Sequence, residues 1–493
     1  MTLNHRVWLV LLSLLPLAEM AHVKQTNLLL IMFDDLRPEL SIYGKKHMLT
    51  PNFERLANRS VTFENSYCQI AVCNPSRDSL LSGLRPDTLG DYGFQNSYGG
   101  NNLIQSQLVK SGYKTAGFGK IRHWDGNDKS NWSHNHTDYE WYDYQNKEYS
   151  TVKATSFADP ETPIEDFRDY VFTSDAILAL HQLHRKKEYF MVAVGYKLPH
   201  LMVHFPHKYR EMYRGSESIW EASKKELKFP PSAPSVAYKC CALQEFAHLH
   251  DEGRSRAVKH TPVQSMKDPF PAEVYKENMW GYSASISFLD DQIGRLLDTL
   301  DELQLWDNIT VVLTADHGMH NGEKGIWEKW TLYDEATHVP LVIYHPDSPH
   351  KGMRYDPAVE SIDVFPTLND ILGAPYDAKA ACKRGGICPP LEGKSLAAVI
   401  NVALPVAFAL SQAWRCAWKR DIIAESENPG QREKRGIWFD CDVSYNGNDQ
   451  VNLMGYSVRS KDFRYTAYFH FDKKEQMPIW ALPPASEELY DHR

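Results

Sequence analysis

The stretch Asn27-Leu28-Leu29-Leu30-Ile31-Met32-Phe33 is followed at once by two carboxylates, Asp34 and Asp35. A continuous apolar run of this length is typical of a strand that is buried on both faces of a parallel sheet. The stretch therefore predicts a buried strand whose last residues carry polar, titratable side chains.

Three further apolar runs end in the same way. Ile309 to Ala315 leads into Asp316-His317-Gly318, Tyr189 to Tyr196 leads to Pro199-His200, and Thr115 to Phe118 leads to Gly119-Lys120 and His123. Helical patterns lie between these runs, at residues 103–110, 172–184 and 286–303. Strands that alternate with helices predict an α/β fold, a large mixed, mostly parallel sheet sandwiched by helices.

In such sheets the ligand binds outside the carboxyl ends of the strands. A lone Asp-Asp pair is more simply explained as a solvated loop or a helix cap. Here four predicted strands each deliver titratable residues at that end, and chance is a poor explanation for all four. The sequence therefore predicts the active site at this edge of the sheet.

The composition is that of an ordinary globular protein. The chain has 493 residues, a formal net charge of −9, 43% hydrophobic and 24% charged residues. This excludes a fibrous or low-complexity chain, and it argues against general binding to nucleic acid or to an anionic membrane. Eight cysteines are too few for a disulfide scaffold.

We expect three segments. Residues 1–21 have a basic start at Arg6, a short apolar run and small residues at Ala18 and Ala21, which is typical of a secretory signal peptide. A membrane anchor is the competing interpretation, but the run is short of the ~20 residues that span a bilayer. Residues 22–375 form the catalytic domain. Residues 376–493 form a smaller α+β domain with an antiparallel hairpin at 456–460 and 463–471.

Four acceptor triplets for N-glycosylation support passage through the secretory pathway. Each triplet alone is weak, but together with the signal peptide they predict a glycoprotein without stable membrane insertion. The triplets begin at Asn58, Asn131, Asn135 and Asn308.

The motif Cys73-Asn74-Pro75-Ser76-Arg77 precedes a helical pattern. Proline suits the first turn of a helix, so Cys73 is expected at a helix N-terminus, where free N–H groups favour anions. Arg77, one turn further on, offers a planar fork for a tetrahedral oxyanion. A buried structural cysteine, or a bridge between Cys68 and Cys73, would also be compatible with the motif.

These residues resemble the type I sulfatases of the alkaline phosphatase superfamily, whose signature is Cys-x-Pro-Ser-Arg followed by a Thr/Ser-Gly segment. Ser82-Gly83 matches that segment. The other polar motifs named above occur in family order, and so does Lys329. Within the family, the resemblance is closest to the iduronate-2-sulfatase branch, although Lys324 and Met319 replace the histidine and tryptophan usual there. The resemblance implies an alkaline-phosphatase-like fold.

The resemblance also implies a nucleophile and a cofactor. Cys73 would be oxidised by the formylglycine-generating enzyme to formylglycine, whose hydrate attacks sulfur. One Ca²⁺ per chain would be held by Asp34, Asp35, Asp316, His317 and an oxygen of the modified Cys73. An oxygen-rich site with several carboxylates suits Ca²⁺ better than Zn²⁺.

The remaining site residues receive roles from their chemical type and the same resemblance. Arg77, Lys120 and Lys329 are expected to neutralise the sulfate oxygens. His200 is the candidate acid for the departing alcohol, and Lys329 is also placed to donate that proton. His123 is the candidate base that takes the proton from the second hydroxyl of the hydrate.

We therefore expect a sulfuric ester hydrolase that removes a 2-O-sulfate from an iduronate residue of heparan or dermatan sulfate, in the lysosome or after secretion. Another sulfated polysaccharide remains open as the substrate. Two further functions compete: a phosphatase or phosphodiesterase, and a catalytically silent sulfated-glycan-binding glycoprotein. A short Cys382–Cys388 disulfide follows from the resemblance; Cys416 with Cys441 is an open pairing, and Cys240 and Cys241 are unassigned.

Overall fold

Strand β1 (Asn27–Asp34) lies in the middle of the main sheet of the computed structural model, and its whole length is buried. Its side chains alternate between two hydrophobic clusters, one on each face of the sheet, as the two-residue period of a strand requires. One cluster contains Leu29, Ile31 and Phe33, and the other contains Leu28, Leu30 and Met32.

The main sheet has the order β12-β2-β11-β8-β1-β6-β3-β4, with β13 paired to β2. β8, β1, β6 and β3 are consecutive parallel neighbours, whereas β11 is antiparallel to both β8 and β2. The predicted mixed, mostly parallel sheet is confirmed. The strand bounds are β2 (Val61–Tyr67), β3 (Lys114–Gly119), β4 (His136–Asp138), β6 (Phe190–Pro199), β8 (Ile309–Ala315), β11 (His338–Tyr344), β12 (Met353–Tyr355) and β13 (Val359–Glu360).

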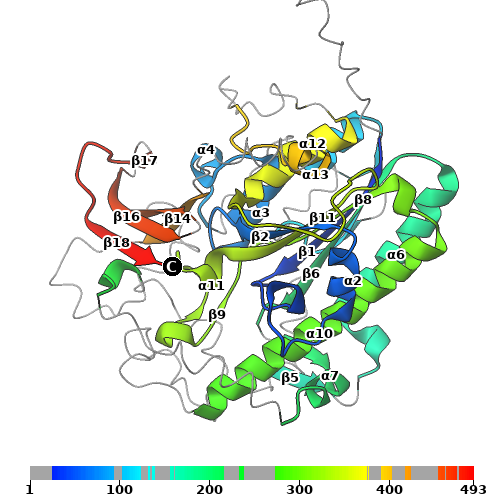
Figure 1. Ribbon diagram of the computed structural model, residues 1–493, viewed down its shortest axis with the longest axis horizontal. Helices are drawn as coiled ribbons and strands as arrows, with labels where there is room; N and C mark the ends of the chain where they lie inside the picture. Colours follow the sequence, from blue (N-terminus) through cyan, green and yellow to red (C-terminus); the bar gives the residue numbers. More distant parts are fainter. Residues whose placement is uncertain are drawn as a thin grey trace, which may run out of the picture.

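Helices cover both faces of this sheet (Figure 1). α2 (Pro51–Ala57), α6 (Arg168–Lys186) and α10 (Ala272–Glu302) pack on one face. The other face is covered by α3 (Cys73–Ser82), α5 (Ile104–Lys110), α12 (Val364–Leu372) and α13 (Ala397–Asn401). Shorter elements are α4 (Pro86–Leu89), α7 (His207–Glu211), α11 (Asp334–Thr337), and the pairs β5 (Ser156–Asp159) with β7 (Val203–Pro206) and β9 (His320–Asn321) with β10 (Trp327–Glu328).

Two predicted elements are longer in the structure. α10 begins well before the apolar pattern at 286–303, because its first turns face the core with buried Tyr275, Met279 and Tyr282. β6 continues past Tyr196 to Pro199 through a shift in register against β1. This shift brings His200 directly to the end of the strand.

The C-terminal residues form an antiparallel sheet of five strands beside the main sheet (Figure 1). The predicted hairpin is confirmed as β15 and β16, paired from Leu453 with His470 to Arg459 with Arg464. Residues 391–400 precede this sheet in the chain, and there Leu396 and Ile400 pack with the core of the large domain. The strands are β14 (Ala417–Ile423), β15 (Leu453–Arg459), β16 (Phe463–Asp472), β17 (Met477–Pro478) and β18 (Ser486–Asp491).

The structure describes residues 25–93, 103–123, 132–133, 136–138, 156–159, 162–201, 203–215, 232–237, 272–374, 376, 390–401, 417–423, 453–460, 462–472, 474 and 477–492. Several predicted features lie outside these ranges: the signal peptide, Asn131, Asn135, and the cysteines at 240, 241, 382, 388, 416 and 441. Among the described helices, none combines the length and the apolar character needed to cross a bilayer.

Candidate active site

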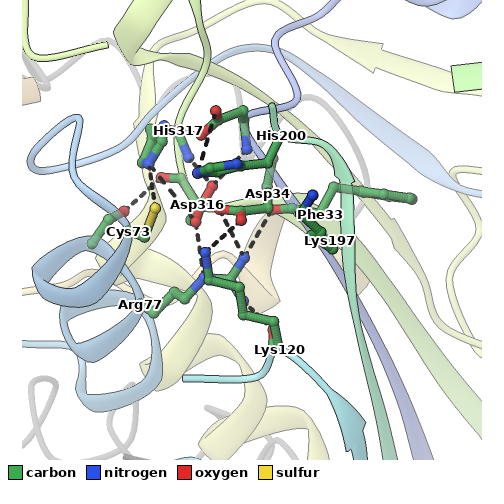
Figure 2. A network of polar contacts seen from close by, with 12 residues as sticks. Phe33, Asp34, Cys73, Arg77, Lys120, Lys197, His200, Asp316 and His317 are labelled. Atoms are coloured by element: carbon green, nitrogen blue, oxygen red, sulfur yellow. Dashed lines mark hydrogen bonds and ion pairs between the residues drawn. The ribbon is translucent and has the colours of Figure 1, made fainter. Parts of the chain in front are cut away.

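The carboxyl ends of β8, β1, β6 and β3 meet at one edge of the sheet, as the sequence predicted. Asp316 and His317 follow β8, Asp34 and Asp35 lie at the end of β1, His200 follows β6, and Lys120 follows β3. Figure 2 shows the side chains of Arg77 and Lys120 pointing toward Asp34 and Asp316. Every one of these side chains is buried or nearly so.

Cys73 is the first residue of α3, after an extended Val72, so it lies at the predicted helix N-terminus. Its Sγ is 3.3 Å from Nε2 of His317 and 3.5 Å from Nζ of Lys329. Cys68 and Cys73 are both free thiols, and a bridge between them is therefore wrong. Burial and the nearby Asp34 carboxylate raise the pKa of the Cys73 thiol well above its usual value, so the unmodified side chain is a poor nucleophile.

Arg77 is wholly buried and binds protein groups with its guanidinium. Nε donates to Oδ2 of Asp316 at 2.8 Å, and the terminal nitrogens donate to the carbonyl oxygens of Phe33, Lys120 and Ile121. Oδ1 of Asp34 lies 3.6 Å away. Arg77 thus holds two carboxylates and the turn after β3 in place. Its contact with sulfate stays a prediction.

Lys120 is placed by a close approach of two backbones. Its N–H donates to the carbonyl oxygen of Gly195 at 2.7 Å, and a Cβ at Gly195 would lie 1.9 Å from the Lys120 carbonyl oxygen. Only glycine permits this approach. The turn directs Nζ of Lys120 to Oδ2 of Asp34, with which it forms a buried ion pair.

Lys329 follows β10 and reaches the other member of the acidic pair. Its Nζ lies 3.1 Å from Oδ1 of Asp35. Asp35 itself has φ 64, a left-handed conformation that is strained for a residue with a side chain. Tyr282 of α10 holds that backbone, because its hydroxyl donates to the Asp35 carbonyl at 2.7 Å and accepts from the Arg37 N–H at 3.1 Å.

Two histidines present Nε2 to the site. Nδ1 of His317 lies 2.9 Å from the Gly318 carbonyl oxygen, and Nδ1 of His200 lies 2.5 Å from that of Leu201. A carbonyl only accepts, so each Nδ1 carries the proton, and each Nε2 carries a lone pair that can accept a hydrogen bond or bind a cation when the ring is neutral. Burial and Lys329 lower the pKa of His317 well below its usual value, which favours this neutral form.

His123 lies in the turn after β3 and is 5% exposed. Burial and the positive charge of Lys120 lower its pKa well below the usual value. The charges of Asp34, Arg77 and Lys329 also act on it, which places its ring within electrostatic reach of the cluster. A neutral imidazole of this kind is suited to accept a proton.

The acidic residues fit a hard cation. Four ligand atoms, from Asp34, Cys73, Asp316 and His317, lie within 4.8 Å of one another, and so does a second set from Asp34, Asp35, Cys73 and His200. Oδ1 of Asp34 is buried and accepts no hydrogen bond from the described residues. Burial raises the pKa of Asp34, but Lys120 and its other cationic neighbours outweigh burial and hold it well below its usual value, so this oxygen is anionic. The Nδ1–carbonyl bond of His317 is the partner that metal-binding histidines commonly have.

Several residues of the site escaped the sequence analysis. Tyr282 and the backbone partners of Arg77 are far away along the chain, and no local motif marks them. The two departures from the iduronate-2-sulfatase branch both have protein partners. The Met319 carbonyl accepts from Arg37, and Lys324 forms an ion pair with Glu335.

The sulfatase family model matches residues 26–374, which is most of the chain and includes every site residue described above. The chain belongs to the sulfatase family. It is 31% identical to iduronate 2-sulfatase of Mus musculus over 91% of this chain and 86% of that protein, and 30% identical to the Homo sapiens enzyme over the same shares. This sulfatase is accordingly a sulfuric ester hydrolase, as the sequence predicted.

Solved structures confirm the fold. The chain is similar to the phosphonate monoester hydrolase SpPMH from Silicibacter pomeroyi, with a TM-score of 0.67 and 22% identity over 95% of this chain and 89% of that one. It is also similar to BT1596, a 2-O GAG sulfatase, with a TM-score of 0.57 and 19% identity over 95% and 85%. These identities are low, so the likeness shows the alkaline-phosphatase-like fold alone.

Proposed function

We propose that this sulfatase removes the 2-O-sulfate from an iduronate residue of heparan or dermatan sulfate, with formylglycine at position 73 as the nucleophile. One observation carries the proposal: Cys73 lies at the start of α3 with Lys329 and the Nε2 atom of His317 against its Sγ. The similarity to two iduronate 2-sulfatases over 91% of the chain supports the choice of sugar.

The metal belongs to the same proposal. Asp34, Asp35, Asp316 and His317 would hold one Ca²⁺ together with an oxygen of the modified Cys73. When bound, the ion would supply positive charge against the sulfate oxygens and favour ionisation of the hydrate. Three carboxylates of the site face three cations, Arg77, Lys120 and Lys329, so the protein groups alone leave little net charge.

The reaction has two halves. In the first, one hydroxyl of the formylglycine hydrate, ionised by loss of its proton to solvent, attacks sulfur with its oxygen, and the bond between sulfur and the sugar oxygen breaks. The departing sugar oxygen takes a proton from Lys329 or from Nε2 of His200, whose ring enters this half as the imidazolium. In the second, His123 takes the proton of the other hydroxyl, the aldehyde C=O forms, and the sulfate leaves with the electron pair of its C–O bond. Water then restores the hydrate.

The cations divide the work between binding and positioning. Lys120 and Lys329 present ammonium groups to the site from two different turns. We assign them the role of stabilising the negative charge that develops on the sulfate oxygens. Arg77 is assigned to positioning, because its donors are engaged by Asp316 and backbone carbonyls.

Passage through the secretory pathway completes the proposal. The formylglycine-generating enzyme would modify Cys73 during maturation, and the protein would act in the lysosome or after secretion. Asn58 is exposed at the end of α2, which leaves its side chain accessible to glycosylation.

A panel of sulfated sugars tests the substrate. The protein, made in cells that contain the formylglycine-generating enzyme, is incubated with an iduronate 2-sulfate disaccharide, a glucosamine 6-sulfate disaccharide and choline sulfate, and released sulfate is measured by ion chromatography. We expect release from the iduronate substrate alone. Faster release from another sugar would contradict the substrate assignment. Binding without any release would favour a silent glycan-binding protein.

A further inference from the structure

A buried ion pair joins Arg122 and Asp78 close to the proposed nucleophile. Nε of Arg122 lies 2.7 Å from Oδ1 of Asp78, and its second terminal nitrogen lies 2.9 Å from Oδ2. The side chains are 4% and 0% exposed. Two parallel hydrogen bonds from one guanidinium fix both the distance and the orientation of the partners.

The pair joins two segments that carry different catalytic groups. Asp78 lies on α3, the helix that begins at Cys73. Arg122 lies in the turn after β3, directly before His123 and two residues after Lys120. The helix that bears the nucleophile is thus bonded to the turn that bears the proposed base.

A second acidic residue, Asp91, lies beside the pair and is favoured in its neutral form. Asp91 is 1% exposed, and its Oδ2 accepts from Nδ2 of Asn74 at 2.9 Å. Burial and the neighbouring Asp78 raise the pKa of Asp91 well above its usual value, which favours the neutral acid. Among the described residues, Asp78 is the carboxylate that forms the ion pair with Arg122.

Stability alone is a weak explanation for this pair. Removing two charges from water costs free energy, and well-packed apolar side chains in place of a buried ion pair are often as stable or more stable. A specific geometry is what the pair supplies that apolar side chains do not. This geometry fixes the position and orientation of the turn at 120–123 relative to α3.

We propose that the Asp78–Arg122 pair is a positioning device that sets His123 relative to residue 73 for the second half of the reaction. The inference rests on the proposed function. In that half, His123 takes the proton of the remaining hydroxyl while the C–O bond to the sulfate breaks and the aldehyde forms. In the first half, the proton for the departing alcohol comes from His200 or Lys329, which lie outside α3 and outside the turn at 120–123.

Arg122→Lys and Arg122→Gln test the device. The lysine variant keeps the charge and loses the fork, which guards against a glutamine variant that fails to fold. We expect a burst of alcohol release close to the number of active sites, followed by steady turnover about 10²-fold below the parent, since a positioned base contributes at least that much. The peptide that carries residue 73 should accumulate the mass of one SO3 group, as measured by mass spectrometry during turnover.

Arg85→Gln is the matched control. Arg85 also forms a two-pronged ion pair, with Glu360, at 2.9 Å through both oxygens, and it is distant in sequence from the turn at 120–123. We expect this variant to lose stability without a burst or an adduct.

Parent-like turnover in both Arg122 variants, or slow turnover without the SO3 adduct, would overturn the positioning role. A parent protein that carries formylglycine and yet releases no sulfate from any sugar of the panel would instead overturn the proposed function, and this inference with it.

Discussion

Two buried carboxylates in this molecule have opposite surroundings. Glu488, in the C-terminal sheet, accepts hydrogen bonds from the hydroxyls of Tyr490 at 2.7 Å, Tyr468 at 2.8 Å and Tyr333 at 3.2 Å. Asp34, at the edge of the main sheet, has cations around it and one buried oxygen without a hydrogen bond from the described residues.

The different partners of these two carboxylates distinguish a group that stabilises the fold from a group that serves the reaction. Both oxygens of Glu488 are satisfied by neutral donors, and this arrangement joins the C-terminal strands to Tyr333 of the large domain without need of a ligand. Within the described part of the chain, Oδ1 of Asp34 is anionic and accepts no hydrogen bond, which is costly unless something else binds there. Burial of a carboxylate alone therefore says little; the partners distinguish a structural group from a reactive one.

Replacing the nucleophile has the largest expected effect. Cys73→Ser lacks the second hydroxyl of a formylglycine hydrate, so a sulfate ester formed on the serine cannot leave by elimination. We expect turnover to fall about 10³-fold or more, with a sulfated peptide detectable by mass spectrometry. Steady turnover by this variant would contradict the proposed mechanism.

Replacing Asp34 tests the reactive side of the comparison. Asp34→Asn removes the anionic oxygen and the charged partner of Lys120. We expect the affinity for Ca²⁺, measured by titration calorimetry, to fall by about 10- to 100-fold. Sulfatase activity should fall with it. An Asp34→Asn variant that binds Ca²⁺ as the parent does would place the metal elsewhere.

Replacing Glu488 tests the structural side. Glu488→Gln offers an amide N–H₂ in place of one oxygen, so at least one tyrosine hydroxyl loses its acceptor. We expect the free energy of unfolding in urea to fall by about 1–3 kcal/mol, with kcat within about twofold of the parent. A large loss of kcat in the folded variant would show that this cluster serves the reaction.

The smallest effect concerns pH. Burial raises the pKa of Glu335, but Lys324 outweighs it, and the net pKa is about 2, against an ordinary 4.5. A depressed carboxyl pKa contributes stability above pH 4.5 that is lost as the pH falls toward 2. Between pH 6 and pH 4 we expect this group to account for a loss of roughly 1 kcal/mol.

Urea unfolding at both pH values measures this contribution. Glu335→Gln should remove that part of the pH dependence, whereas Glu302→Gln, at an exposed position of α10, should leave it intact. Equal pH slopes in the parent and in Glu335→Gln would show that the Lys324–Glu335 pair does not stabilise the fold.

The sequence predicted the parts of the molecule that local patterns encode. The strand β1 with its terminal Asp34 and the β15–β16 hairpin follow from apolar runs and the polar breaks that end them. The helix start at Cys73 follows from the proline in its first turn. The carboxyl ends of neighbouring parallel strands lie at one edge of the sheet, and ligands bind there. This general property of parallel sheets predicted which residues form the site.

Long-range side-chain partners were beyond such patterns. The type and spacing of Arg77 suit an oxyanion, but they gave no sign of the backbone carbonyls from β1 and from the turn after β3 that its guanidinium also contacts. The Asp78–Arg122 pair spans 44 positions in the chain, and the tyrosines around Glu488 come from separate elements. Only the packing of the elements brings such groups together.

Mass spectrometry of the peptide that carries residue 73 is the most direct test of the central claim. The protein is made in cells that contain the formylglycine-generating enzyme, and the peptide is compared with one from cells that lack it. We predict an aldehyde or its hydrate at position 73 in the first sample and a thiol in the second. An unmodified thiol in both samples would contradict the claim, because no hydrate would then exist to attack sulfur.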